Sequence, residues 1–165
     1  FRRSELVALR IEDMAFDAVG LVIRIRRSKT DQEGKGAEVA IPRAPELRYC
    51  PVTAAEDWVR WLGKSEGPFL RGLANGMPAA EHLGGDRVCR AVKAAVERIG
   101  EDPSLYSGHS LRAGLATSAA RAGASDVELM RQGRWMSRSS MDRYQRERDR
   151  WRDNAAGRIY AKEEA

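Results

Sequence analysis

The sequence lacks the features that mark several large classes of protein. Its 165 residues include only two cysteines, Cys50 and Cys89, and neither belongs to a Cys-x-x-Cys pair or lies near a histidine at metal-ligand spacing. We therefore expect two reduced thiols in a cytosolic protein, rather than a disulfide framework or a zinc site. No run of about eighteen apolar residues occurs, so the sequence predicts no membrane span.

Motifs of nucleotide binding and of common hydrolases are also missing. There is no Walker-type glycine loop, no Gly-x-Ser-x-Gly elbow and no carboxylate pair in an apolar setting. The only histidines are His82 and His109, and His82 lies in a glycine-rich stretch without a local partner. Metal-dependent nuclease sites are therefore not expected, because they need clusters of histidines and carboxylates. Any phosphate chemistry would therefore use side-chain cations and a side-chain nucleophile.

Positive charge, by contrast, is plentiful in one segment. The chain has 29 Lys and Arg against 24 Asp and Glu, a net charge of +5, and residues 131–158 contain nine arginines and four acidic residues. Arginine binds phosphate oxygens in a bidentate fashion, so this segment favours a nucleic-acid partner. A solvated, salt-bridged helical face would have the same composition, so charge alone leaves both interpretations open.

The apolar spacing predicts a mostly α fold with a small antiparallel β-sheet, in the α+β class. Strands are expected over residues 19–27 and 37–42, joined by a turn-rich connector that carries Lys29. A Gly/Pro-rich loop is expected over residues 66–85. The remaining segments have helical periodicity or capping residues: 4–14, 52–62 after Pro51 and before Gly63, 86–99 from Asp86 to Gly100, 110–122 before Gly123, a capping box at Ser125–Glu128, 137–144 and 149–162.

One short motif could bind an anion. His109-Ser-Leu-Arg112 places an imidazole and a guanidinium on the same face of the first turn of a predicted helix. The N-terminus of a helix also attracts anions, so this turn is a candidate phosphate or oxyanion site. A buried histidine bonded to backbone would give the same pattern, so the spacing alone does not decide between them.

Five motifs, in order along the chain, resemble those of the tyrosine recombinase (phage integrase) family. Residues 106–114, Tyr-Ser-Gly-His-Ser-Leu-Arg-Ala-Gly, are similar to the family's His-x-x-Arg box, especially in its Cre-type branch, which also reads Ser-Gly-His-Ser. Residues 2–6 resemble the first box, Arg-x-Ser-Glu-Leu, and the Ser-Lys-Thr around Lys29 resembles the hairpin of the catalytic lysine. Trp135 precedes Tyr144 by nine residues, the family's spacing between its His/Trp position and its nucleophile.

The resemblance implies a site-specific DNA recombinase or integrase that cuts and rejoins strands through a 3′-phosphotyrosyl intermediate, without metal or cofactor. Tyr144 would attack the scissile phosphate, and Arg2 and Arg112 would stabilise the charge of the transition state. Lys29 would protonate the leaving 5′-oxygen, and His109 would bind the phosphate or assist proton transfer at the tyrosine.

The same resemblance implies a supporting set of residues. Trp135 would pack behind the site and donate its indole N–H to a phosphate oxygen, although a buried tryptophan is as often plain core packing. Glu5 would orient an arginine or the histidine from behind, or it is an exposed helix charge. Contacts to DNA are expected from Arg134, Arg138 and Arg143.

Several assignments keep a rival. Arg3 competes with Arg2 for the first catalytic arginine, and Lys35 competes with Lys29 in the same connector. The family usually has glycine directly before its His/Trp position, whereas Arg134 stands there in this chain, after Gly133. A shift of one residue would place Arg134 itself in that role. Tyr49, Tyr106 and Tyr160 lack the spacing of the nucleophile.

The resemblance also implies how the chain is organised. Residues 1–147 are expected to form the catalytic domain, and residues 148–165 a C-terminal helix or tail that docks on a neighbouring protomer or packs on its own domain. The resemblance also implies an N-terminal core-binding domain, which we expect to lie outside this chain, so we expect weak activity from these residues alone. The expected partners are double-stranded DNA and, for the full-length protein, a homotetramer on paired sites; no membrane and no small-molecule substrate are expected.

Two other functions remain open at this point. A type IB topoisomerase would share the chemistry, and a non-catalytic DNA-binding module would share the fold. A bacterial or phage-encoded enzyme acting in the cytoplasm, at the nucleoid, is the expectation. The target site, and the choice between integration, resolution and inversion, do not follow from the sequence.

Overall fold

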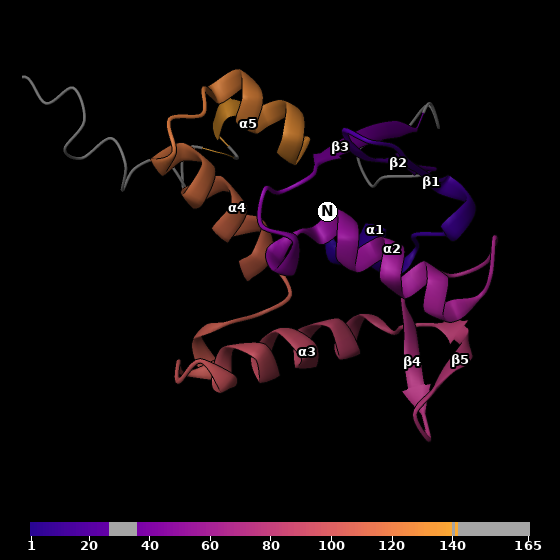
Figure 1. The fold of residues 1–165 in the computed structure, drawn as a ribbon. Helices are drawn as coiled ribbons and strands as arrows, with labels where there is room; N and C mark the ends of the chain where they lie inside the picture. The colour runs from indigo at the N-terminus through magenta and orange to yellow at the C-terminus, as the bar shows by residue number, and fades with distance from the viewer. Residues whose placement is uncertain (27–35, 140, 142–165) are drawn as a thin grey trace, which may run out of the picture. The chain divides into compact units, whose positions relative to one another are not determined.

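A computed structural model describes residues 1–26, 36–139 and 141 (Figure 1). The chain divides into two compact units, Phe1–Gly108 and His109–Ala165. Within the described residues the fold is about half helical, with small antiparallel sheets, which confirms the α+β class. Among the helices of the described residues, none combines the length and the hydrophobicity that a membrane span requires.

The first unit is built around a three-stranded antiparallel sheet in the order β1-β2-β3. Its strands are β1 (Met14–Phe16), β2 (Gly20–Ile25) and β3 (Ala37–Pro42). In β2 the alternate residues Leu21, Ile23 and Ile25 are buried while Arg24 is exposed, as period-two patterning requires. Leu21 and Ile23 share a core with Leu9 and with Val52 and Ala55 of α2 (Pro51–Leu62).

The prediction of a helix over residues 4–14 was wrong beyond residue 7. Helix α1 covers Arg3–Val7, a 3-10 turn covers Ile11–Asp13, and β1 follows directly. The backbone between them bonds to a distant segment: Phe69 N–H donates to Leu9 O and Ile11 N–H donates to Gly67 O, both at 2.9 Å. These tertiary hydrogen bonds replace helical ones, so the apolar spacing that suggested a helix instead serves an extended segment.

Helix α2 begins and ends where the sequence predicted. Pro51 occupies its first turn, where a missing N–H costs nothing. Gly63 follows in the left-handed region at φ 59°, and its N–H donates to Val59 O and Arg60 O. Glycine adopts this conformation without the Cβ penalty that other residues incur.

The loop expected over residues 66–85 was also wrong, because it contains a β-hairpin. Strands β4 (Arg71–Ala74) and β5 (Met77–His82) pair around Asn75 and Gly76, whose φ angles are 51° and 77°. Two consecutive positive φ values are the signature of the type I′ turn that Asn-Gly favours. The buried Arg71 holds the hairpin by donating to the carbonyls of Pro68, Ala79 and Ala80 at 2.9 to 3.2 Å.

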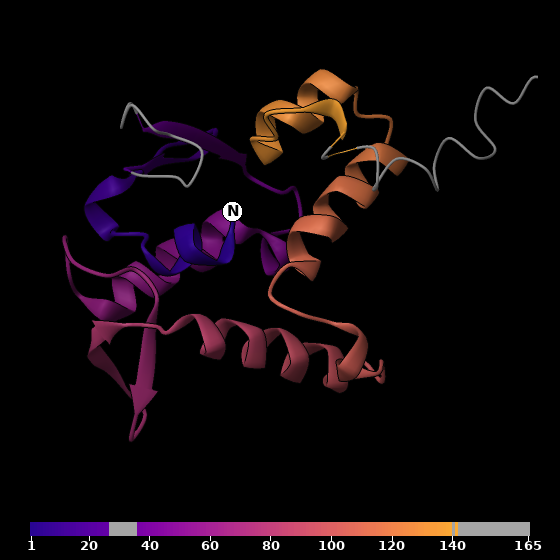
Figure 2. The same cartoon turned by 180° about the vertical axis from the view of Figure 1, so that it is seen from behind.

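Helix α3 (Gly85–Arg98) follows the hairpin, which projects from its start (Figures 1 and 2). Gly84 is its N-cap residue, so the prediction that Asp86 caps this helix was wrong and Asp86 lies in the first turn. The helix buries Val88, Val92 and Val96, which are spaced by four residues on one face. It ends before Gly100, which has a φ of 81°.

The second unit contains α4 (Ser110–Arg121) and α5 (Asp126–Gly133). The predicted capping box at the start of α5 is confirmed: Ser125 N–H donates to the Glu128 carboxylate at 2.7 Å, and Glu128 N–H donates to Ser125 Oγ at 3.3 Å. The apolar core of this unit consists of Ala116, Ala120, Leu129, Trp135 and Met141. Arg138, Ser139 and Met141 are helical.

Candidate active site

Arg2 and Glu5 form a pair at the start of α1. Glu5 Oε1 accepts a hydrogen bond from the Arg2 guanidinium at 2.7 Å, and Oε2 accepts one from the Arg2 backbone N–H at 2.6 Å. Glu5 is only 4% exposed, whereas the Arg2 side chain is 27% exposed. A carboxylate at the third helical position that reaches back to the N-cap N–H is half of a capping box. The buried carboxylate therefore fixes both the backbone and the side chain of Arg2.

Arg3, the alternative to Arg2 as the first catalytic arginine, is exposed, and its side chain lies beside other residues. Its side chain passes along the backbone of Gly85 and Gly108: a Cβ added at either glycine would lie 3.3 to 3.4 Å from its nearest atom. The two neighbouring arginines thus have separate surroundings. Of the two, Arg2 is the one whose guanidinium is held by a buried carboxylate.

His109 and Arg112 lie at the start of α4. His109 is the N-cap residue and is exposed, and its carbonyl accepts from the N–H groups of Arg112 and Ala113 at 3.1 Å. Arg112 is only 6% exposed and begins the buried stripe that continues with Ala116 and Ala120. A charged residue at the first position of an otherwise alanine-lined buried face is unusual, since burying a guanidinium is costly without compensation.

Trp135 supplies part of that compensation. The guanidinium carbon of Arg112 lies 4.3 Å from the centroid of the Trp135 ring, which is a cation–π contact. Trp135 is 9% exposed and belongs to the apolar core of the second unit. Such a contact is worth about 2 kcal/mol when both groups are shielded from water. The structure thus joins two of the predicted site residues, which lie 23 positions apart in the sequence.

Arg134 occupies an unusual backbone position between α5 and Trp135. It is the C-cap residue of α5, with φ 53° and ψ 48° in the left-handed region. This conformation favours glycine, which agrees with the glycine that the family usually has directly before its His/Trp position. The arginine at this place is therefore compatible with Trp135 in the predicted role, at the cost of a strained backbone.

The other predicted residues are less fully defined. Arg138 is exposed and forms an ion pair with Asp126 in the first turn of α5, with its Nε 2.9 Å from the carboxylate. Lys29, Tyr144 and Arg143 lie outside the described residues, as do Lys35 and the tail from residue 148. The described candidates therefore form two groups: Arg2 with Glu5 in the first unit, and His109, Arg112, Arg134, Trp135 and Arg138 in the second.

A network of charges holds the end of β2, just before the connector that carries Lys29. Arg26 donates to Asp13 at 2.9 Å and to Glu12 at 3.2 Å, and Glu12 also accepts from the side chain of Arg10 and from Gly67 N–H. The hydrogen bond from Arg10 is the main reason why the pKa of Glu12 falls from its ordinary 4.5 to about 2. This network links the sheet to the segment before the hairpin.

Two further properties bear on the chemistry. Within the described residues, no three His, Cys, Asp or Glu side chains come together in a way that could hold a metal ion.

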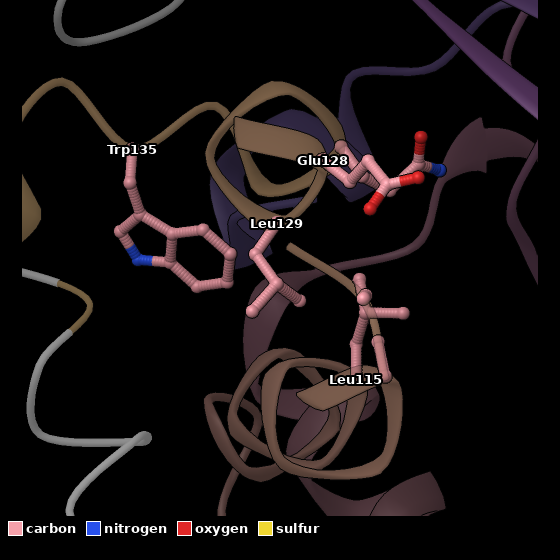
Figure 3. A pocket seen from close by; sticks show the side chains of 7 residues that line it. Leu115, Glu128, Leu129 and Trp135 are labelled. Carbon is pink, nitrogen blue, oxygen red and sulfur yellow. The ribbon is translucent and has the colours of Figure 1, made fainter. Parts of the chain in front are cut away.

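The second unit also has a hollow of about 210 Å³, lined by residues of α4 and α5 and by Trp135 (Figure 3). Leu115, Leu129 and Trp135 make most of it apolar, with Glu128 at its border.

The role of Gly133 does not follow from the sequence alone. This glycine is buried at the end of α5, and a Cβ added to it would stand 2.5 Å from Cη2 of Trp135 and nearer still to its Cε3 and Cζ3 atoms. No side chain larger than hydrogen fits there without moving the indole. The sequence offers one hint of this role, because Gly133 stands two residues before Trp135. The family usually has its glycine one residue later, directly before the His/Trp position.

Comparison with known proteins gives two relatives. An "Integrase/recombinase xerD homolog" of Selenomonas ruminantium is 38% identical over 163 residues, which cover 98% of this chain and 48% of that protein. "Recombinase cre" of Escherichia phage P1 is 29% identical over 163 residues, covering 90% of this chain and 46% of that protein. The chain thus spans about half the length of the curated relatives it matches. No family model matches it.

Proposed function

Because this chain belongs to the tyrosine recombinase family, we propose that it is the catalytic half of a site-specific DNA recombinase. Its substrate would be double-stranded DNA, and its nucleophile would be Tyr144. Residues 1–147 would form the catalytic domain, and a separate N-terminal core-binding domain would complete the grip on DNA. An enzyme of this kind would act on DNA in the cytoplasm of a bacterium.

The observation that carries the proposal is the fixed position of Arg112. Its guanidinium is buried, lies over the Trp135 ring and stands one turn into a helix whose N-cap residue is His109. A cation held in place before the substrate arrives stabilises developing negative charge without reorganising in the reaction. The helix N-terminus adds a favourable field for an anion at the same turn. This combination suits a phosphate diester whose charge grows in the transition state.

In the proposed reaction, the phenolic oxygen of Tyr144 attacks the scissile phosphorus. A bond forms between the tyrosine oxygen and the 3′-phosphate, and the bond from phosphorus to the 5′-oxygen breaks. Lys29 gives a proton to the leaving 5′-oxygen. The tyrosine gives up its own proton to solvent, either directly or through His109, which otherwise binds the phosphate. Arg2 and Arg112 bind the non-bridging oxygens.

Rejoining is the reverse of this step with a new strand. The 5′-hydroxyl of the partner strand attacks the phosphotyrosine, the phosphodiester forms again and Tyr144 is released. The covalent intermediate keeps the energy of the broken bond, so neither a nucleotide cofactor nor a metal is required. Glu5 supports the cycle by holding the Arg2 guanidinium at 2.7 Å. Arg134, Arg138 and Arg143 would contact the DNA around the site.

Strand exchange between two DNA sites needs several protomers, and we propose a tetramer of the full-length protein. The hollow between α4 and α5 is a suitable receiving surface for the C-terminal tail of a neighbour (Figure 3). The tail sequence has Trp151, Ala155 and Ile159 at helical spacing, which would match an apolar hollow. A disulfide crosslink between cysteines introduced at Leu115 and Ile159 in differently tagged copies tests donation to a neighbour; a crosslink only within single copies would contradict it.

Covalent capture tests the proposed function and does not require the DNA site to be identified first. The full-length protein is incubated in EDTA with a library of randomised duplexes that carry a nick, so that the short cleaved fragment diffuses away. We expect adducts that survive SDS, are removed by protease, and are absent with Tyr144→Phe. Sequencing the captured DNA should give one preferred site. If no adduct depends on Tyr144, the protein is not a recombinase of this kind and a non-catalytic DNA-binding role is the better account.

Plasmid relaxation separates a recombinase from a type IB topoisomerase, since both would form the same kind of adduct. A topoisomerase relaxes supercoiled plasmids of unrelated sequence, whereas the proposed recombinase should do so only when the captured site is present. Relaxation of every plasmid at the same rate would favour the topoisomerase.

A further inference from the structure

We infer that Gly133 is a positioning residue for the reaction, acting on Arg112 through Trp135. This inference rests on the proposed function, because it assigns Arg112 to the phosphate. Gly133 does not touch the substrate in this account. Its contribution is the empty volume beside its Cα atom, which the indole ring of Trp135 fills.

Gly133 lies against Trp135, and Trp135 in turn lies against Arg112. A Cβ at Gly133 would overlap the outer ring carbons of Trp135, and the same ring carries the Arg112 guanidinium at 4.3 Å from its centroid. All three residues are buried, with Arg112 and Trp135 at 6% and 9% exposure. A buried ring has little room to move aside, because protein interiors are close-packed. Any group larger than hydrogen at position 133 must therefore displace the indole, and the surface under the guanidinium moves with it.

A substitution at Gly133 should therefore displace the charge of the Arg112 guanidinium as well as lower the stability of the second unit. A displacement of about 1 Å in a catalytic group can lower the rate by up to about a hundredfold. We therefore expect Gly133→Ala to slow covalent capture at saturating DNA by at least tenfold. DNA affinity should change less, since most of the binding comes from phosphate contacts elsewhere on the protein.

Two further variants separate positioning from loss of stability. Ser125→Ala removes the capping box of the same helix α5 without touching the indole, so it weakens the second unit and leaves the Arg112–Trp135 contact in place. Trp135→Phe keeps an aromatic face but lacks the outer indole carbons that a Cβ at position 133 would meet. In the Trp135→Phe background, Gly133→Ala should therefore slow capture by less than twofold.

An NMR measurement on the protein without DNA reads the position of Arg112 directly. The ring current of Trp135 should shield the side-chain Nε–H proton of Arg112, whose signal is assigned by its loss in Arg112→Lys. Gly133→Ala should move this signal toward the value of an unstacked arginine, and Ser125→Ala should leave it unchanged. An unchanged signal in Gly133→Ala, or an equal change in Ser125→Ala, would overturn the inference.

Covalent capture tests the proposed function, and the NMR signal of Arg112 tests the role of Gly133 separately. If the wild-type protein gives no Tyr144-dependent adduct, the proposed function is wrong, whereas the NMR signal still reports whether Gly133 sets the place of Arg112. If adducts form but Gly133→Ala slows capture equally in the wild-type and Trp135→Phe backgrounds, the function stands and the inference about Gly133 falls. A tenfold effect that Trp135→Phe suppresses, together with a shifted Arg112 signal, supports both.

Discussion

Replacing Arg134 by glycine should stabilise the second unit while weakening its hold on DNA. Arg134 ends α5 with φ 53° and ψ 48°, a left-handed conformation that brings the Cβ of an L-residue close to a carbonyl oxygen. Glycine has no Cβ and adopts this conformation freely. The substitution therefore removes strain at the residue that leads from α5 to Trp135.

The size of the effect follows from two opposing terms. A non-glycine residue loses about 1–2 kcal/mol in the left-handed region. Glycine in turn loses about 0.5–1 kcal/mol more conformational entropy on folding. We expect a net gain of about 0.5–1 kcal/mol in the free energy of unfolding, which for a chain of 165 residues raises Tm by about 1–4 °C.

Arg134→Ala is the matched control, because alanine removes the charge but keeps the Cβ and its strain. Thermal unfolding should rank Arg134→Gly above both Arg134→Ala and the wild type. DNA binding should not separate the two variants: both lose one phosphate contact, which lowers the slope of log affinity against log salt by about 0.9. Equal stability of the glycine and alanine variants would refute the argument from backbone strain, and an unchanged salt slope would remove Arg134 from the DNA contacts.

Three other substitutions test separate contacts. Glu5→Gln should lower the free energy of unfolding in urea by about 1–3 kcal/mol, because Arg2 loses a buried charged acceptor; an effect no larger than that of the exposed Glu46→Gln would contradict this. Arg71→Lys should raise hydrogen exchange at the β4–β5 amides at least tenfold, since lysine cannot reach three carbonyls at once; unchanged exchange would show that the hairpin does not depend on Arg71. Because the pKa of Glu12 is lowered to about 2, the unfolded chain binds more protons than the folded one between about pH 4.5 and 2, and stability falls as the pH falls through this range. Glu12→Gln should make that fall shallower, and an identical pH profile would contradict the assigned pKa.

Local signals in the sequence predicted much of the fold. Pro51 and Gly63 bound α2, and the Ser125–Glu128 box starts α5, because these residues act through their own backbone neighbours. The three-stranded sheet was partly visible in the alternation of β2. Such features need no information from distant parts of the chain.

The observed elements differ from the predicted ones where they depend on contacts between distant parts of the chain. Apolar spacing continued past Val7, but Leu9 and Ile11 bond to the backbone near Gly67 and Phe69, so the helix ends early. The hairpin has only a weak signature in the sequence: Asn75-Gly76 is a strong turn signal, but the strands around it are short and poor in β-branched residues.

The candidate site shows the same division between local and distant information. The ordered motifs named Arg2, His109, Arg112 and Trp135, and the structure adds how some of them are held. The stacking of Arg112 on Trp135 depends on how α4 packs beside the end of α5. Sequence spacing alone does not contain that packing, and the space beside Gly133 becomes meaningful only once the indole is in place.

The proposed recombinase chemistry is best tested by identifying the residue that becomes joined to DNA. The adduct captured in EDTA is digested with nuclease and protease, and the remaining nucleotide is located by mass spectrometry. We expect a nucleotide linked through its 3′-phosphate to Tyr144, with a free 5′-hydroxyl on the released strand. A link to another residue, a 5′-phosphate linkage, or an adduct that persists in Tyr144→Phe would contradict it.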